Sequence, residues 1–227
     1  MARTLYQEEN VWPERLERLP SLRLTVPLAR LREIGSVVES SRHLARQMAL
    51  QVDFKQPGLV VELGPGRGAI TRELFKRVAN RKQLLLIEVG GEFIPDLRRQ
   101  FQGVSVVHDS AEWLVKHIRG RRVAAVVSSL PLRSLPEKVV HRIGVALQHV
   151  MDPHTRYIQF TYDLRPARSV YFADVGMDKH HSGIVWRNMP PARVDSFCLA
   201  EGEERGRVAQ VIRTASVLPG QSRLFAR

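Results

Sequence analysis

Short apolar segments alternate with helical patterns through the middle of the chain, and this alternation is the strongest constraint on its fold. Five segments rich in branched aliphatic and aromatic residues are typical of buried strands. They lie at residues 58–63, 83–88, 104–107, 123–128 and 156–162. Helical spacing of apolar residues fills the intervals at 68–79, 91–101, 110–118 and 136–150. This order predicts an α/β fold, in which a parallel sheet carries helices on both faces.

Two more strands are expected after the fifth apolar segment. The stretches "SGIVWRNMPP" and "ARVDSFCLAEG" have strand-like composition and are joined through Pro190 and Pro191. They predict an antiparallel pair that completes a mostly parallel sheet of seven strands. The domain is expected to cover residues 51–213, and residues 214–227 are expected to form a tail.

Residues 1–50 precede the first strand and differ from the rest in composition. The stretch "WPERLERLPSLRLTVPLARLREI" interleaves leucine with arginine, which is the composition of an interfacial helix. A helix that packs on the sheet has the same pattern, and Pro20 and Pro27 would divide it into pieces. The residues alone therefore leave two alternatives for this helical extension, namely a membrane-binding or lid segment and a packed helix.

The composition favours an intracellular protein with an anionic partner. The formal charge of +12, from 35 basic and 23 acidic side chains, suits nucleic acid or acidic lipid, although the charge is spread along the chain. No apolar run reaches the roughly 20 residues that span a bilayer, and the first residues are not those of a signal peptide. Cys198 is the single cysteine, so an internal disulfide and a cysteine-built metal site are excluded.

A glycine-rich stretch follows the first expected strand and opens the first helix. In "VELGPGRGAIT" the residues Glu62, Gly64, Gly66 and Gly68 alternate with others. Glycine allows the backbone to approach a ligand, and the helix start offers free N–H donors. The spacing departs from the dinucleotide fingerprint, and Glu62 would repel a diphosphate. A ligand with a cationic amino-acid part suits the stretch better.

Acidic residues also end the second and third expected strands, and ligands bind at such strand ends in parallel sheets. Glu88 can accept hydrogen bonds from both hydroxyls of a ribose, and Asp109 can accept from an adenine amino group. The glycine stretch and the two acids together match S-adenosylmethionine, which has both an adenosine and a methionine part. The alternative is a set of surface carboxylates beside a structural glycine turn.

Several motifs resemble class I methyltransferases that act on amino groups. "VVELGPGRGAITREL" is similar to the first motif of the rRNA adenine dimethyltransferases and of the bacterial phospholipid N-methyltransferases. After the fourth strand the rRNA enzymes carry an Asn-Leu-Pro-Tyr type of motif, whereas the residues here are Ser128, Ser129, Leu130, Pro131 and Leu132. That form resembles the phospholipid enzymes, as do "VVESSRHLARQMA", "YIQFTY" and "VWRNMPPARV". The resemblance covers roughly residues 28–197.

The resemblance implies a Rossmann-like class I methyltransferase with S-adenosylmethionine as cofactor. It also implies a peripheral position on the cytoplasmic side of the inner membrane, where the amino-terminal helix docks on anionic phospholipid. The implied substrate is the amino headgroup of phosphatidylethanolamine and its methylated derivatives. The residues implied to hold the cofactor are Glu62, Gly64, Gly66, Gly68, Glu88, Asp109 and Ser128. No metal is expected.

Candidate catalytic residues follow from the chemistry of methyl transfer to an amine. An ammonium must first lose its proton, so acceptors must lie close to it. Backbone carbonyls at Ser129 and Leu130 are candidates, and Tyr162 is a candidate aromatic that lines the amine site. Arg187 is the candidate for binding a substrate phosphate. His180 and His181 fall in a stretch expected to form a lid, and they are either bases or surface residues.

Two features separate this chain from the families that it resembles. Asp163 stands where the phospholipid enzymes usually have glycine, and the segment 163–182 has no clear counterpart.

An RNA adenine N6-methyltransferase remains the main alternative, since the net charge would suit RNA. Two observations argue against it. No aromatic residue follows Pro131 to stack on a base, and the chain is too short for the extra helical domain that those enzymes carry. A methyltransferase of another aminolipid or small amine, and a non-catalytic binding protein, are further alternatives.

Overall fold

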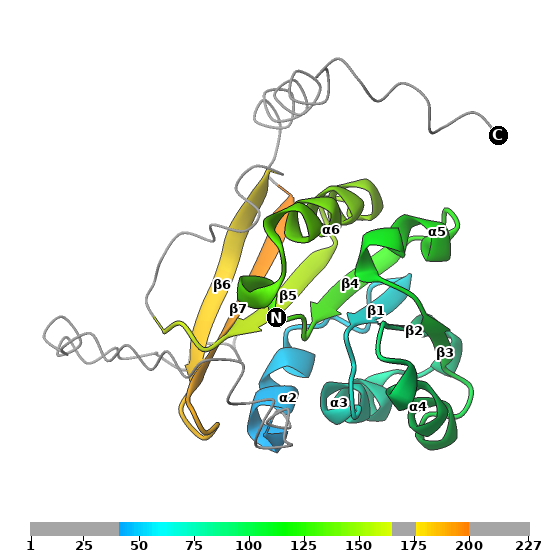
Figure 1. Cartoon of the computed structure of the whole chain (residues 1–227), viewed down its shortest axis with the longest axis horizontal. Coiled ribbons are helices and arrows are strands. Elements are labelled where there is room, and N and C mark those ends of the chain that lie inside the picture. Colours follow the sequence, from blue (N-terminus) through cyan, green and yellow to red (C-terminus); the bar gives the residue numbers. More distant parts are fainter. Residues whose placement is uncertain (1–40, 165–175, 200–227) are drawn as a thin grey trace, which may run out of the picture. The chain divides into compact units, whose positions relative to one another are not determined.

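Seven strands form one sheet in the computed structural model, which describes residues 41–164 and 176–199. The strand order is β3-β2-β1-β4-β5-β7-β6 (Figure 1). The strands are β1 (Leu59–Leu63), β2 (Leu84–Glu88), β3 (Ser105–His108), β4 (Val123–Ser128), β5 (Arg156–Thr161), β6 (Met177–Val185) and β7 (Ala192–Leu199). The first five pair in parallel, and β7 pairs antiparallel with β5 and β6. The predicted sheet is confirmed.

Helices cover both faces of the sheet, as predicted (Figure 1). They are α2 (Arg42–Leu50), α3 (Ala69–Arg77), α4 (Ile94–Gln100), α5 (Leu114–Ile118) and α6 (Glu137–Val150). Within β1, Val60 packs in a cluster with α2 and α3, whereas Leu63 packs in a cluster with α5 and α6. Because side chains alternate between the faces of a strand, the two clusters lie on opposite sides of the sheet.

Two helices are shorter than predicted because each begins with a 3-10 turn. Gly91–Phe93 precedes α4, and Ala111–Trp113 precedes α5. Pro95 lies in the first turn of α4, where its missing N–H leaves no helical hydrogen bond unmade. The tighter turns change the boundaries of these helices but not the face of the sheet that they cover.

The hairpin of β6 and β7 differs from its predicted form. β6 starts at Met177, earlier than expected, and residues 186–191 form a turn rather than strand. Pro190 and Pro191 have no N–H to donate, so the strand ladder cannot continue through them. His180 and His181 are consequently exposed residues of the edge strand β6, and the expectation that they belong to a lid is wrong.

The helix α2 is part of the packed core. Leu44 and Met48 are fully buried, and the hydroxyl of Ser41 caps the helix by accepting from the N–H of Leu44 at 3.2 Å. The rest of the expected amphipathic extension lies outside the described residues, as do the tail and most of the expected lid. Within the described ranges, no helix is long and apolar enough to cross a membrane.

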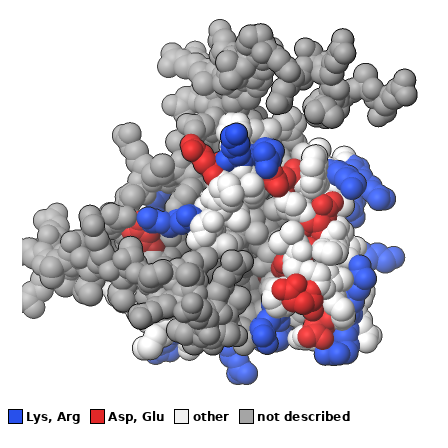
Figure 2. All heavy atoms as spheres, in the orientation of Figure 1, with Lys and Arg blue, Asp and Glu red and all other residues white. Residues whose placement is uncertain are grey.

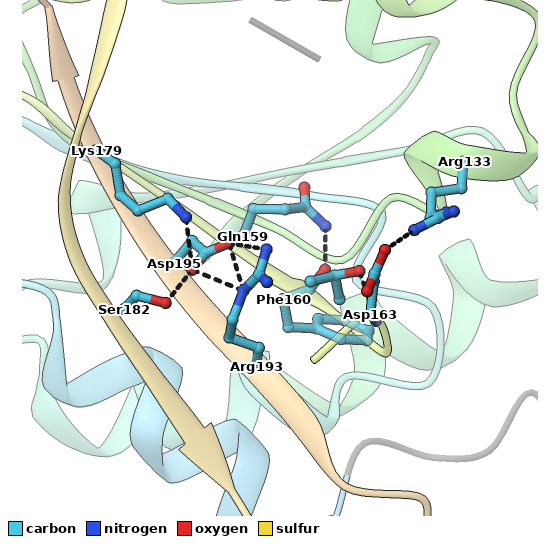
Figure 3. A network of polar contacts seen from close by, with 9 residues as sticks. Arg133, Gln159, Phe160, Asp163, Lys179, Ser182, Arg193 and Asp195 are labelled. Atoms are coloured by element: carbon cyan, nitrogen blue, oxygen red, sulfur yellow. Dashed lines mark hydrogen bonds and ion pairs between the residues drawn. The ribbon is translucent and has the colours of Figure 1, made fainter. Parts of the chain in front are cut away.

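A buried ion pair on β7 was not predicted. Arg193 and Asp195 are 7% and 4% exposed. The guanidinium donates to both carboxylate oxygens, with distances of 3.0 Å from Nε and 2.8 Å from Nη2 (Figure 3). The hydroxyl of Ser182 donates to Asp195 at 2.6 Å, and the Lys179 ammonium lies 3.8 Å away. Arg193 pairs in register with Thr161, so the ion pair lies near the carboxyl end of β5.

We expect Asp195→Asn to lower the free energy of unfolding by about 3 kcal/mol, because removal of one partner leaves the other charge buried. Asp96 and Arg99 form an exposed pair on α4, with side chains 57% and 75% exposed. Asp96→Asn is the matched control and should cost less than about 1 kcal/mol. Urea unfolding followed by circular dichroism measures both. Equal losses in the two variants would contradict a structural role for the buried pair.

Candidate functional site

The carboxyl ends of β1, β2 and β4 meet at one edge of the sheet. Leu63 pairs in register with Ile87 of β2 and with Ser128 of β4. The strands stay connected just beyond their ends, since the N–H of Gly64 donates to the Ile87 carbonyl and the N–H of Ser129 to the Leu63 carbonyl, both at 2.9 Å. The glycine stretch, Glu88 and Ser129 are therefore brought together, as the sequence predicted.

The glycine stretch forms a loop in which Gly64, Gly66 and Gly68 all have positive φ. A Cβ on Gly68 would lie 2.6 Å from the ring of Phe101, and one on Gly64 would lie 2.9 Å from Leu130. A Cβ on Gly66 would meet nothing within 4 Å. Packing thus accounts for the first and third of these glycines, and the middle one borders open space.

Glu88 holds the loop in place. Its two carboxylate oxygens accept from the N–H groups of Gly66, at 2.8 Å, and of Gly90, at 2.7 Å. The side chain is buried, because Glu88 is 5% exposed. A carboxylate offers about four lone-pair positions, so each oxygen retains capacity for one more donor. That capacity fits the two hydroxyls of a ribose.

Glu62 is a fully buried carboxyl beside the loop. Neither of its oxygens has a partner with good hydrogen-bond geometry among the described residues. Burial raises its pKa to about 8, the nearby Thr71 hydroxyl opposes the rise, and the charge of Glu88 adds to it. An unpaired buried acid is costly unless it is neutral or meets a cation. Glu62 therefore fits the ammonium of an amino-acid ligand.

Asp109 lies close to Glu88, since its N–H donates to the Glu88 carbonyl at 3.0 Å. Its carboxylate is engaged with its own segment. It accepts from the His117 ring at 2.7 Å and from the N–H of Ser110 at 2.8 Å, and the Lys116 ammonium is 3.6 Å away. The His117 contact and the Ser110 N–H lower the pKa of Asp109. The acid is thus ionised and already paired beside the site.

The segment after β4 is fixed by side chains of β5. Ser128 is fully buried, and its hydroxyl accepts from the N–H of Leu130 at 3.3 Å. The amide of Gln159 donates to the Leu130 carbonyl at 3.1 Å, and Gln159 itself accepts from the Tyr157 hydroxyl at 2.7 Å. Arg133, also after β4, forms an ion pair with Asp163, which follows β5 (Figure 3). Gln159 was missed from the sequence, although a polar residue inside the apolar run "YIQFTY" was its signal.

The remaining candidates lie at different distances from this edge. Tyr162 packs edge-on against Phe160, with ring centroids 5.6 Å apart. Burial raises its pKa and a contact with Asn188 opposes the rise, so the phenol is protonated near neutral pH and is not a base. Arg187 is exposed in the β6–β7 turn. His181 pairs with Ser196, well before the carboxyl end of β6, so the histidines are not brought to the site.

Within residues 41–164 and 176–199, no group of three His, Cys, Asp or Glu side chains is placed to hold a metal ion. The edge offers an open glycine loop, a carboxylate with spare lone pairs, and a second acid with no well-placed hydrogen-bond partner among the described residues. These three features fit the amino-acid and ribose parts of S-adenosylmethionine.

Sequence comparison places methyltransferases among the relatives of the chain. No family model matches it. An ornithine lipid N-methyltransferase of Singulisphaera acidiphila is 28% identical over 134 residues, which cover 56% of this chain and 70% of that protein. Ribosomal RNA small subunit methyltransferase A of Hydrogenobaculum sp. is 27% identical over 104 residues. Those residues cover 46% of this chain and 40% of that relative.

Solved structures with the same fold are also methyltransferases. A TehB-like SAM-dependent methyltransferase of Corynebacterium glutamicum has a TM-score of 0.53 at 15% identity, over 76% of this chain and 94% of the other. The 1,6-didemethyltoxoflavin-N1-methyltransferase of Burkholderia thailandensis, with S-adenosylhomocysteine bound, has a TM-score of 0.57 at 13% identity, over 77% and 86% of the two chains. The chain is therefore a methyltransferase with the Rossmann-like class I fold, and its cofactor is S-adenosylmethionine.

Proposed function

We propose that the chain methylates the amino headgroup of phosphatidylethanolamine and its methylated derivatives at an anionic membrane surface. The observation that carries this proposal is the segment after β4. Leu132, which follows Pro131, is aliphatic and only 5% exposed, so this position offers no aromatic face on which a nucleobase would stack. A relative that is an ornithine lipid N-methyltransferase by name supports an aminolipid as the class of substrate.

In this proposal the cofactor-binding residues contact different parts of S-adenosylmethionine. Glu62 binds the ammonium of the methionine part, Glu88 binds the ribose hydroxyls, and Gly66 lets the backbone approach. Ser128 supports the turn beneath the cofactor, and Asp109 faces the adenine. When bound, the cofactor supplies an electrophilic methyl group on a good leaving group, so the protein contributes mainly by orientation.

The amine is positioned by the segment after β4. The carbonyls of Ser129 and Leu130 accept from the amine nitrogen, which orients its lone pair. Gln159 keeps the Leu130 carbonyl in place through a 3.1 Å hydrogen bond. Tyr162 contributes its ring, since its protonated phenol is not a base and its π face attracts the positive charge that develops on the amine nitrogen as the methyl group is transferred. Arg187 binds the phosphate of the headgroup bidentately.

Two other acceptors have specific support. Another aminolipid, with an amino-acid headgroup, is favoured by the ornithine lipid relative. An RNA adenine is favoured by the rRNA relative, which the chain matches over 104 residues. Both use the same cofactor site, so the acceptor assay described below distinguishes them.

We expect Gly66→Ala to weaken S-adenosylmethionine binding by at least about tenfold. The left-handed φ of +53° costs an alanine about 1 kcal/mol, so the fold persists while the new methyl group enters the ligand space. Gly58→Ala is the control, because its Cβ would lie 2.7 Å from the Arg122 carbonyl oxygen, remote from the loop. It should lower the thermal midpoint and leave the affinity unchanged. Calorimetry that gives equal affinities for Gly66→Ala and the parent would refute the placement of the cofactor.

The raised pKa of Glu62 predicts a pH dependence of both stability and binding. Between pH 4.5 and about 8 the folded chain holds a proton that the unfolded chain has released, so the free energy of unfolding falls as pH rises. Cofactor affinity rises over the upper part of that range, because the ammonium favours the ionised carboxylate. Glu62→Gln should remove both trends, with a higher thermal midpoint at about pH 8 and weaker binding.

Thermal unfolding and calorimetry between about pH 6 and about pH 8.5 measure these trends. Glu92→Gln, at an exposed position, is the matched control and should retain both. A Glu62→Gln protein whose binding still strengthens with pH would show that another group carries the dependence.

The acceptor is tested with labelled S-adenosylmethionine and three substrates in parallel. These are anionic vesicles with phosphatidylethanolamine, the same vesicles with ornithine lipid in its place, and unmodified ribosomal RNA. We expect label in phosphatidylethanolamine. Label in ornithine lipid alone would transfer the assignment to amino-acid lipids, and label in RNA alone would refute a lipid acceptor.

A further inference from the structure

The turn between β6 and β7 exposes large apolar side chains. Trp186 is 59% exposed and Met189 is 87% exposed, with Arg187 between them also exposed. Asn188 alone points inward and is 2% exposed. Exposure of a tryptophan and a methionine to water at the tip of one turn is unfavourable, and exposed apolar patches of this kind often mark interaction sites. A tryptophan with a neighbouring cation is, by contrast, typical of a membrane interface.

Asn188 attaches this turn to α2. Its side-chain oxygen accepts from the N–H of Ser41 at 3.1 Å, and its amide donates to the Pro190 carbonyl at 2.7 Å. Ser41 is the capping residue of α2, so the turn lies against the first turn of that helix. The apolar tip and the amino end of α2 therefore belong to one continuous surface.

A basic cleft begins at the same end of α2. Its volume is about 520 Å³, and it is lined by Arg42, His43, Arg46, Glu73, Lys76 and Arg77. The single acid is shared, because Lys76 and Arg77 pair with it at 2.6 and 2.8 Å. Within the described part of the chain, no carboxylate pairs with the two arginines of α2. The cleft therefore carries an excess of positive charge.

Basic side chains also occur elsewhere on the described surface, where several of them stand beside acidic ones (Figure 2). What distinguishes one region is that two arginines with no carboxylate partner among the described residues lie near an exposed tryptophan and methionine. We call this region the docking surface. It consists of the turn at residues 186–191 and the cleft between α2 and α3.

We propose that the docking surface binds an anionic phospholipid bilayer, with Trp186 and Met189 entering the interface and the α2 arginines contacting lipid phosphates. This inference deepens the proposed function and rests on its membrane substrate. Basic residues gain from the negative potential of the bilayer, and apolar side chains gain by leaving water. RNA would be drawn to the arginines too, but it offers no apolar environment for Met189.

The turn lies at the same edge of the sheet as the candidate site. β7 starts opposite the carboxyl end of β5, since Arg193 pairs with Thr161. The turn therefore lies at the edge of the sheet where β1, β2 and β4 also end. A bilayer on the docking surface would face the same edge as the glycine loop, so a lipid headgroup has a short path to the methyl donor.

The first test is partitioning of the full chain onto vesicles of phosphatidylcholine and phosphatidylglycerol, which contain no methyl acceptor. Each basic residue near such a surface contributes about 1 kcal/mol, so Arg42→Gln with Arg46→Gln should weaken partitioning about 30-fold. The matched control is Arg119→Gln with Lys138→Gln, exposed residues beside α5 and on α6. Those helices cover the opposite face, and the control should change partitioning less than about twofold.

The apolar part is tested with a pair of equally exposed tryptophans. Trp186 and Trp113 are each 59% exposed. We expect Trp186→Ser with Met189→Ser to weaken partitioning about tenfold, and Trp113→Ser to leave it unchanged. A protein that keeps Trp186 alone should be quenched by brominated lipid, whereas one that keeps Trp113 alone should not. Circular dichroism checks that each variant is folded.

The outcomes separate this inference from the proposed function. Unchanged partitioning in the arginine and turn variants would overturn the docking surface even if the enzyme methylates phosphatidylethanolamine. Weakened partitioning, together with label only in RNA, would keep the surface and refute the lipid acceptor. Loss of RNA binding in the arginine variant, with vesicle partitioning intact, would assign the cleft to RNA and overturn the inference.

Discussion

The site depends on one carboxylate that spans two strand ends. Glu88 ends β2 and accepts from the N–H of Gly66, which follows β1. Parallel pairing places the two strand ends side by side, but it does not decide the path of the loop between β1 and α3. The buried carboxylate favours one path, because turning the Gly66 N–H elsewhere would leave one of the two Glu88 oxygens without its donor. On this path Gly66 borders open space.

Much of the fold was predictable because buried parallel strands are apolar along most of their length. Every residue of β1, β2 and β4 is buried, so each strand is visible as a mostly apolar run with a polar residue only at or next to its carboxyl end. The residues that follow such runs fall at the same edge, which is why Glu62, Glu88 and Ser129 were found together. Where that logic failed, a local constraint prevailed. β6 ended at Val185, so the residues between it and the prolines form a turn, and 3-10 turns shortened two helices.

Contacts between segments distant in sequence were not predictable. Gln159 reaches Leu130 across 29 positions, and the Asn188 contact with Ser41 spans 147. The apolar run around Gln159 indicates that its amide is buried, but neither sequence context identifies the partner of the amide. The buried pair of Arg193 and Asp195 was not predicted either, because alternating charges on a strand usually indicate a solvent-facing side, whereas here the two charges pair with each other within the sheet.

Asn188 is shared by three parts of the molecule. It caps the turn that carries Trp186, it accepts from the start of α2, and it lies against the phenol of Tyr162. A buried amide with these neighbours cannot shift for one of them alone. The outer tip of the hairpin, the start of α2 and the tyrosine that follows β5 therefore share one buried side chain, and a displacement of the turn would disturb its contact with that tyrosine.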